Sequence, residues 1–329
     1  MRISPKTVWK AFQKDPLLPL LLPECRTIEN SITELKWIKE NFNNNYTKKD
    51  RLNLIKKSCL KRQKHYPLQY ILGDQPFGKL DILCRPGVLI PRWETEEWCH
   101  ELIELMNENV MQKSNETMGG IETKLRYIDL CTGTGCILLL LAASLNLKDP
   151  MGIDLSSKAI SLANQNLQHN VSYYKNSLSQ PKFLQKDVFE MDPTKENLPH
   201  FDLVTSNPPY IHDHLHSKSV KIYEPKLALY GNLEFYKNLV GKWCNQTDSF
   251  VYELGSIHQA QYVRDCLSNE EWDVGVYKDS ANHIRCVYGY RKKNISVANI
   301  HWKKVFEKFG TLFAAKKTNK TKHLTNGKH

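Results

Sequence analysis

The chain has 329 residues, of which 41% are hydrophobic and 25% are charged, and its formal net charge is +11. These values are typical of a globular protein of about two domains. The longest apolar run, residues 136–143, is much shorter than the roughly 20 residues that cross a bilayer, so we expect no transmembrane helix.

Positive charge is concentrated at the two ends of the chain. Residues 1–14 carry +4 and residues 291–329 carry +10, which leaves 11 − 14 = −3 for the segment 15–290. Enzymes that bind nucleic acid duplexes usually carry their positive charge around the active site. The acid-free start has the composition of a mitochondrial import segment, although a frayed basic terminus would look the same. The tail is predicted to be disordered beyond about Phe313.

The cysteines and histidines give little reason to expect a metal. There are nine cysteines and no C-x-x-C pair, which favours a reducing compartment and argues against structural zinc. Three histidines alternate over residues 212–216: His212, His214 and His216. We interpret them as an ordinary polar loop and expect no metal site.

The first predicted elements are helical. Residues 28–65 read as two helices, the first opened by a capping box of Ser31 and Glu34. The apolar positions predict two inner faces, Leu35, Ile38 and Phe42 in one helix, and Leu52, Ile55, Cys59 and Leu60 in the other. Residues 66–92 contain short β-rich pieces between Gly and Pro, as in hairpins. Residues 94–110 then return to a helix with Trp98, Leu102 and Leu105 inside.

Strands and helices alternate from residue 127 onward. Strands are predicted at 127–130, 151–155, 182–188 and 201–206, with helices at 136–144 and 156–170, and later strands at 249–255 and 283–291. This alternation is typical of an α/β protein with a mostly parallel, doubly wound sheet. In such a sheet, ligands bind at the carboxyl ends of the strands.

The loop after the first of these strands has the features of a cofactor site. Gly133 and Gly135 allow close approach of a ligand, and Asp154, 21 residues after Gly133, can accept hydrogen bonds from ribose hydroxyls. Leu138 breaks the G-x-G-x-x-G pattern of dinucleotide sites, which favours S-adenosylmethionine as the cofactor and Asp129 as a partner for its ammonium group. Strand-end capping is the competing explanation for both acids.

Two later strand ends complete the predicted site. Asp187 can accept from an adenine amino group, with Val188 and Phe189 against the ring. The segment Asn207-Pro208-Pro209-Tyr210 is a stiff corner, because proline fixes φ and lacks an N–H group. The side-chain oxygen of Asn207 and the carbonyl of Pro208 can grip both hydrogens of a planar NH₂ group and align its nitrogen with a sulfonium methyl. Tyr210 can cover the flat group, and neither a metal nor a general base is required.

Several motifs together resemble the HemK/PrmC family of peptide chain release factor glutamine N5-methyltransferases. They are PLQYILGDQPFG, VLIPRWETEE, DLCTGTG, GIDLS, FLQKDVF, FDLVTSNPPYI, YEPKLALYG, YELG and IRCVYGY, from about Pro67 to Arg291. The resemblance implies a Rossmann-like class I methyltransferase sheet of seven strands. It also implies S-adenosylmethionine-dependent methylation of the Gln in the Gly-Gly-Gln tip of a release factor, in support of translation termination.

The residues and the resemblance together give the expected site residues and a domain plan. The cofactor site would comprise Asp129, Cys131, Thr132, Gly133, Thr134, Gly135, Asp154, Asp187, Val188 and Asn207, with Asn207, Pro208, Pro209 and Tyr210 holding the substrate glutamine. The expected domains are an import segment (1–14), a helical domain that engages the release factor (15–65), a β-hairpin linker (66–92), the methyltransferase domain (93–291) and a basic tail (292–329). We expect a monomer in the mitochondrial matrix, as for a fungal mitochondrial member, and no membrane partner.

Two residues depart from the family pattern, and other functions remain open. Cys131 replaces the first glycine of the cofactor loop, and Val188 stands where some members have Trp, which puts cofactor affinity in doubt. The main alternative is an N6-adenine or N2-guanine methyltransferase of DNA or RNA, which would grip an extruded base with the same corner. The acidic body and short connections argue against it. A non-catalytic subunit or a nicotinamide oxidoreductase fits the motifs less well.

Overall fold

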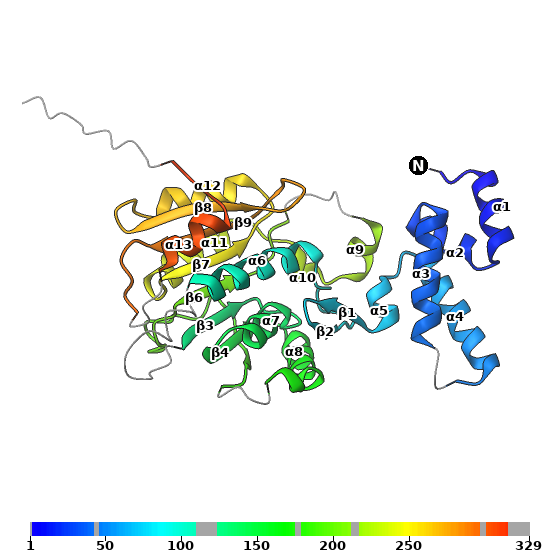
Figure 1. Cartoon of the computed structure of the whole chain (residues 1–329), viewed down its shortest axis with the longest axis horizontal. Coiled ribbons are helices and arrows are strands. Elements are labelled where there is room, and N and C mark those ends of the chain that lie inside the picture. Colours follow the sequence, from blue (N-terminus) through cyan, green and yellow to red (C-terminus); the bar gives the residue numbers. More distant parts are fainter. Residues whose placement is uncertain are drawn as a thin grey trace, which may run out of the picture.

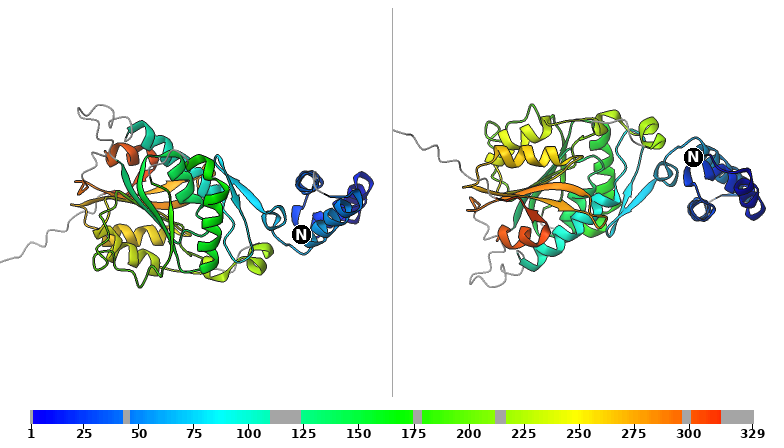
Figure 2. Two further views of the ribbon diagram at one scale, coloured as in Figure 1. Left: turned by 90° about the horizontal axis from the view of Figure 1, so that it is seen from below. Right: turned by 90° about the horizontal axis from the view of Figure 1, so that it is seen from above.

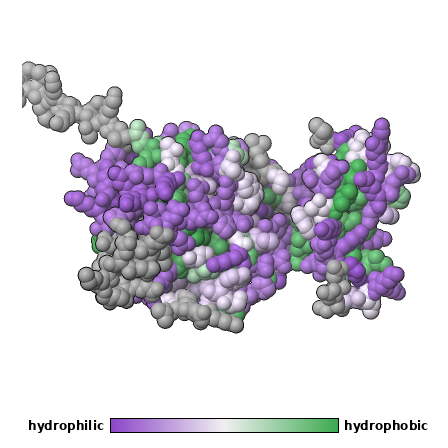
Figure 3. Space-filling view, in the orientation of Figure 1, coloured by the Kyte–Doolittle hydropathy of each residue, from purple (hydrophilic) through white to green (hydrophobic). Residues whose placement is uncertain are grey.

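A computed structural model describes residues 2–42, 46–109, 124–174, 179–211, 217–296 and 301–314. Figure 1 shows a small helical lobe, which contains the N-terminus, beside a larger α/β body. The space-filling view narrows to a waist between the two (Figure 3). The histidines at 212–216 and half of the basic tail, residues 297–300 and 315–329, lie outside the described residues.

The helical lobe consists of α1 (Pro5–Lys14), α2 (Leu18–Cys25), α3 (Ile28–Asn41) and α4 (Lys48–Gln63). Its core contains Leu21, Leu22, Leu35, Ile38, Ile55 and Cys59. Leu52 and Leu60 are exposed, so the inner face predicted for the second helix is only half correct. Residues 1–14, the proposed import segment, provide α1, whose Ala11 is buried in this core, while Trp9 and Phe12 are exposed.

The predicted capping box at Ser31 is wrong. Helix α3 is capped by Thr27, whose hydroxyl accepts a hydrogen bond from the backbone N–H of Asn30. Ser31 is buried one turn inside the helix, and Glu34 receives two hydrogen bonds from Arg62, at 2.7 and 2.8 Å. The carboxylate that would have completed the capping box is therefore used to join α3 to α4.

Three short elements connect the lobe to the body: helix α5 (Leu68–Leu72) and the hairpin strands β1 (Asp74–Phe77) and β2 (Leu80–Leu83). The side chains of Asn166 and Asn170, in and after helix α8 (Ser157–His169), hydrogen-bond the backbone of the hairpin. A third contact comes from helix α9 (Lys218–Tyr223), where the hydroxyl of Tyr223 donates to the carbonyl of Lys64. The predicted hairpin is thus confirmed, and it is anchored to the body.

The body is built on a mixed sheet in the order β10-β8-β9-β7-β6-β3-β4-β5, which has eight strands within the described part of the chain. The strands are β3 (Leu125–Leu130), β4 (Leu147–Asp154), β5 (Lys182–Gln185), β6 (Leu203–Ser206), β7 (Ser249–Glu253), β8 (Trp272–Lys278), β9 (Ile284–Arg291) and β10 (Thr311–Leu312). Strands β3 to β7 pair in parallel, whereas β8, β9 and β10 pair antiparallel. The predicted α/β fold is confirmed, but the expected number of seven strands is wrong for the described part of the chain, because β10 pairs with β8 and adds an eighth strand at the edge.

Helices cover both faces of this sheet (Figure 2). One face packs against α6 (Trp93–Asn109), α7 (Cys136–Ser144), α8 (Ser157–His169) and α13 (Trp302–Phe309), and the other against α11 (Glu234–Gly241) and α12 (Ile257–Cys266). Short helical turns occur at α10 (Lys226–Leu229), Val171–Tyr174 and Trp243–Asn245. None of the helices in the described ranges combines the length and the apolar character needed to traverse a bilayer.

Two parts of the body were not anticipated from the sequence. Strand β8 lies between β9 and β10, although no strand was predicted over residues 272–278. Residues 302–312, which we placed in the basic tail, form α13 and β10, and Trp302, Val305, Phe306 and Phe309 are buried against the sheet. Lys303 and Lys308 lie on the solvent side of the same helix, so a basic composition conceals a buried apolar face.

Candidate active site

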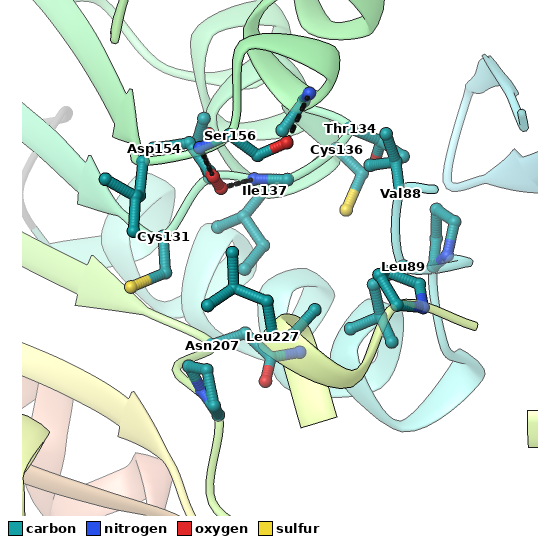
Figure 4. Close-up of a pocket in the computed structure, with 18 of the residues that line it drawn as sticks. Val88, Leu89, Cys131, Thr134, Cys136, Ile137, Asp154, Ser156, Asn207 and Leu227 are labelled. Carbon is teal, nitrogen blue, oxygen red and sulfur yellow. Dashed lines mark hydrogen bonds between the residues drawn. The ribbon is translucent and has the colours of Figure 1, made fainter. Parts of the chain in front are cut away.

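A pocket opens at the carboxyl ends of β3, β4 and β6, the edge that the sequence predicted. Strand β3 has β4 on one side and β6 on the other, so the connections diverge here, as at the ligand-binding crevice of doubly wound sheets. The pocket encloses about 1070 Å³, including space open to solvent, which is the size of a cofactor site. Figure 4 shows Asp154, Cys131, Asn207 and Leu227 around it.

The predicted cofactor loop forms one wall. Cys131, Thr132, Gly133 and Thr134 line the pocket. Asp154 accepts hydrogen bonds from the backbone N–H of Gly133 at 2.9 Å and of Ser156 at 2.8 Å, and burial raises its pKa. These bonds fix the carboxylate at the pocket wall and leave it lone pairs for further donors such as ribose hydroxyls.

The two glycines of the loop have different tasks. A side chain at Gly133 would meet nothing within 4 Å, but its φ of +56° favours glycine. A Cβ at Gly135 would lie 2.8 Å from the ring of Phe183, and Gly135 is absent from the lining. Gly135 therefore allows α7 to pack closely, whereas Gly133 gives the loop its shape beside the pocket.

Asp129 lies behind the pocket rather than in its lining. It is fully buried, and its two oxygens accept hydrogen bonds from the hydroxyls of Thr132 and Thr205, each at 2.6 Å. Burial raises the pKa of Asp129 to about 7. In this arrangement the carboxylate supports the loop, and the proposed contact with an ammonium group stays a prediction.

Asp187, Val188 and Phe189 lie together on the next wall. The carboxylate of Asp187 accepts from the backbone N–H of Phe189 at 2.8 Å, which closes a tight turn. Val188 is buried, and its carbonyl accepts from Asn238 at 3.0 Å. The position therefore provides an apolar surface next to an acceptor, as an adenine ring requires.

The Asn-Pro-Pro-Tyr corner forms the floor between the cofactor loop and helix α6. The amide nitrogen of Asn207 donates to the hydroxyl of Thr95 at 3.3 Å, and Asn207 and Pro209 line the pocket. Pro208 and Tyr210 are not in the lining. The hydroxyl of Tyr210 points to the buried carboxylate of Glu253, 3.5 Å away.

The sequence reasoning missed one whole side of the pocket. It is formed by Gly87, Val88, Leu89, Ile90, Pro91, Arg92 and Thr95 before and in α6, and by Pro225, Leu227, Ala228 and Phe235. Arg92 donates to Glu224 at 2.7 and 2.8 Å, and this pair joins the two segments. Both segments belong to motifs, VLIPRWETEE and YEPKLALYG, that were noted without a role.

The chemistry of the lining fits S-adenosylmethionine better than a pyrophosphate cofactor. Of the described residues that line the pocket, Arg92 is the one Lys or Arg, and Glu224 already binds it. A pyrophosphate would lack cationic partners there, whereas Asp154, the open backbone at Gly133 and the apolar surface of Val188 suit a nucleoside. Within the described ranges, no three His, Cys, Asp or Glu residues are grouped so that they could hold a metal ion.

Comparison with known proteins shows the family of the chain. A family model described as "Methyltransferase domain" matches residues 121–297. The chain is 40% identical over 320 residues to the mitochondrial MRF1 N(5)-glutamine methyltransferase MTQ1 of Saccharomyces cerevisiae, covering 94% of this chain and 95% of that protein.

Two further relatives extend the comparison. A probable MRF1 mitochondrial N(5)-glutamine methyltransferase of Schizosaccharomyces pombe is 33% identical and covers 89% of this chain and 98% of its own length. A release factor glutamine methyltransferase of Haemophilus influenzae is 32% identical, and the match covers 71% of this chain and 78% of that protein. The similarity thus includes the helical lobe as well as the pocket. The chain belongs to the release factor glutamine methyltransferase family, S-adenosylmethionine-dependent enzymes that methylate the side-chain nitrogen of a protein glutamine.

Proposed function

We propose that the protein transfers a methyl group to the glutamine side chain in the Gly-Gly-Gln tip of a mitochondrial release factor, in the mitochondrial matrix, and so supports translation termination. The observation that carries this proposal is the bond from the amide nitrogen of Asn207 to Thr95. With its nitrogen engaged there, the amide oxygen of Asn207 is the end that can accept from a substrate NH₂ group.

The corner would act by alignment. A carboxamide nitrogen is a poor nucleophile because its lone pair is delocalised into the carbonyl group. The oxygen of Asn207 and the carbonyl of Pro208 would bind the two amide hydrogens and hold the nitrogen in line with the methyl group. After transfer, the nitrogen carries an extra proton, which it loses to water or to an acceptor at the corner.

Bound S-adenosylmethionine supplies an electrophilic methyl group on a positive sulfonium. Asp154 would hold the ribose, Asp187 and Val188 the adenine, and the 131–135 loop the amino acid part. Leu227 and Phe235 would exclude water from the reacting atoms, which strengthens the polar contacts at the corner. The roles given to these residues, and to Asp129, Pro208, Pro209 and Tyr210, are part of the proposal.

Two observations support the partner and the compartment. The relatives from Saccharomyces and Schizosaccharomyces are named as mitochondrial enzymes that act on MRF1. The helical lobe is highly basic, since Lys and Arg outnumber Asp and Glu by 15 to 6 over residues 1–66, a net +9. A basic lobe next to an acidic catalytic body suits a substrate that spans both parts.

Radiolabelled methyl transfer tests the proposal. The protein is incubated with labelled S-adenosylmethionine and a mitochondrial release factor, or with the same factor whose tip Gln is replaced by Ala. We expect label in the first factor and none in the second. Label in the replaced factor, or in added RNA or DNA but not in the release factor, would contradict the proposal.

A substitution in the corner tests the mechanism separately. We expect Asn207→Ala to abolish transfer and to leave binding of S-adenosylhomocysteine largely intact, because Asp154 and the loop remain. Both quantities are measured on the same preparation, with thermal unfolding as the control for folding. Equal loss of both in a well-folded variant would contradict the role given to Asn207.

A further inference from the structure

A buried carboxylate lies directly behind the Asn-Pro-Pro-Tyr corner. Glu253 is the last residue of β7, is 5% exposed, and accepts a hydrogen bond from the indole N–H of Trp98 at 2.9 Å. The hydroxyl of Tyr210 donates to its second oxygen at 3.5 Å, and the hydroxyl of Thr95 interacts with the same carboxylate and lowers its pKa. Nothing in the reaction described above uses this acid.

The direction of these hydrogen bonds is determined by the groups involved. Trp98 can only donate, and a carboxylate can only accept. Thr95 is 1% exposed, so its hydroxyl proton needs an acceptor inside the protein, and the side-chain interaction of Thr95 with Glu253 that lowers the pKa of this carboxyl provides one. The oxygen of Thr95 is then left to accept, and it does so from the amide nitrogen of Asn207 at 3.3 Å.

We propose that Glu253 and Thr95 are positioning residues that fix which end of the Asn207 amide faces the substrate. Because Thr95 accepts from the nitrogen, the oxygen of Asn207 faces the pocket, where an acceptor is needed to grip the NH₂ group. We call the hydrogen bonds from Asn207 to Thr95 and from Thr95 to Glu253 the relay. If its direction were reversed, the NH₂ group of Asn207 would face the pocket and present two donors to a substrate group that itself donates. This inference rests on the proposed function.

Protonation of Glu253 would reverse the relay. Burial raises the pKa of Glu253 to about 6. A protonated Glu253 donates a hydrogen bond, so Thr95 no longer needs to donate to it and no longer has to accept from Asn207. The charged and titratable groups that act on Glu253 from the surrounding elements are Glu94 and Cys99 from α6, Arg285 and Cys286 from β9, Asp129 from β3, Cys136 from α7, and Tyr210 and Tyr236.

Three variants test this relay: Thr95→Val, Thr95→Ser and Glu253→Gln. Valine keeps the shape of threonine and removes the hydroxyl, whereas serine keeps the hydroxyl. We expect kcat for the release factor to fall at least about tenfold in Thr95→Val and Glu253→Gln, on the scale of one lost buried hydrogen bond, and to stay within about threefold in Thr95→Ser. The dissociation constant of S-adenosylhomocysteine should not change in any of them.

The pH profile separates this role from a structural one. We expect kcat of the wild type and of Thr95→Ser to fall below about pH 6, and the residual activity of Thr95→Val and Glu253→Gln to lack this acid limb. Folding is checked by the melting temperature. A Thr95→Val variant that keeps wild-type kcat, or that retains the acid limb, would overturn the inference.

The outcomes also distinguish this inference from the proposed function. If the wild type transfers no methyl group to the release factor, the proposed function fails before any variant is compared. If the wild type is active and Thr95→Ser loses as much activity as Thr95→Val, the relay fails and the function stands. If Glu253→Gln does not fold, the comparison of Thr95→Val with Thr95→Ser still tests the relay, because both variants keep the carboxylate of Glu253.

Discussion

Gly231 lies against the backbone of the Asn-Pro-Pro-Tyr corner, and its replacement by Ala is a direct test of how precisely the corner must be placed. A Cβ at Gly231 would lie 2.2 Å from the carbonyl oxygen of Pro209 and 2.8 Å from its carbonyl carbon. The contact is with backbone, so no side chain can rotate away. Gly231 has no left-handed φ, and the only obstacle to alanine is steric.

The size of the displacement follows from these distances. Ordinary van der Waals contact begins at 3.4 Å, so Gly231 and Pro209 must separate by 3.4 − 2.2 = 1.2 Å. The two segments are joined by a bridge between Ile211 and Tyr230, which limits independent movement. A misplacement of about 1 Å in a catalytic geometry can lower the rate about 100-fold, or about 2.7 kcal/mol in the barrier.

We therefore expect Gly231→Ala to lower kcat for the release factor about 100-fold, with little change in the affinity for S-adenosylhomocysteine. Single-turnover methylation and calorimetric titration measure the two quantities. Gly241→Ala is the matched control, since a Cβ there meets nothing within 4 Å at the end of α11, and its kcat should be unchanged.

A second glycine approaches the corner from another side. A Cβ at Gly255 would lie 2.9 Å from both Cδ2 and the carbonyl oxygen of Tyr210, so Gly255→Ala should also lower kcat. If folded Gly231→Ala and Gly255→Ala proteins both keep kcat within about twofold of Gly241→Ala, the claim that transfer depends on precise placement of the corner is refuted.

Three further predictions concern the loop, the buried acid and the lobe. Cys131 and Gly133 both have φ of +56°, a conformation that favours glycine. In urea unfolding, Cys131→Gly should raise the free energy of unfolding by up to about 1 kcal/mol, and Gly133→Ala should lower it by a similar amount. The opposite signs would exclude backbone strain at this loop. Because the pKa of Asp129 is raised, its contribution to the free energy of unfolding is complete below its usual pKa of 3.8 and is lost as pH rises through about 7. Urea titrations should therefore show a smaller loss of stability between about pH 5 and about pH 8 in Asp129→Asn than in the wild type. An equal loss in both proteins would count against this linkage. The net charge of +9 on residues 1–66 predicts that KM for the release factor rises between about 0.05 and 0.3 M salt, whereas the affinity for the cofactor stays unchanged. A KM that is independent of salt would rule out an electrostatic role for the lobe.

Much of the candidate site could be predicted because parallel strands end at a common edge. Once the strand and helix alternation was recognised, Asp154, Asp187 and Asn207 had to emerge near one another. The three do line one pocket. The helical lobe was also predictable in outline, although the predicted cap at Ser31 is wrong: Thr27 caps the helix, and Glu34 pairs with Arg62 instead.

Other residues could not be placed from the sequence. Asp129 follows the same strand pattern as Asp154, but its side chain is turned into the body, where two threonine hydroxyls bind it. Residues 302–312 have the charge of a disordered tail, and only the contacts of Trp302 and Phe306 with the sheet explain why they fold.

By itself, the sequence determined the alternation of strands and helices from residue 127 to residue 206, the edge at which the polar residues meet, and the stiff corner, because these depend on local periodicity and on the fixed φ of proline. Only the tertiary structure decided what surrounds that corner. Thr95, Gly231 and Glu253 lie 112, 24 and 46 positions from Asn207 in the chain, and none of them carries a local signal for this contact. Close packing brings them together, and it fixes both the position of the corner and the direction of its hydrogen bonds.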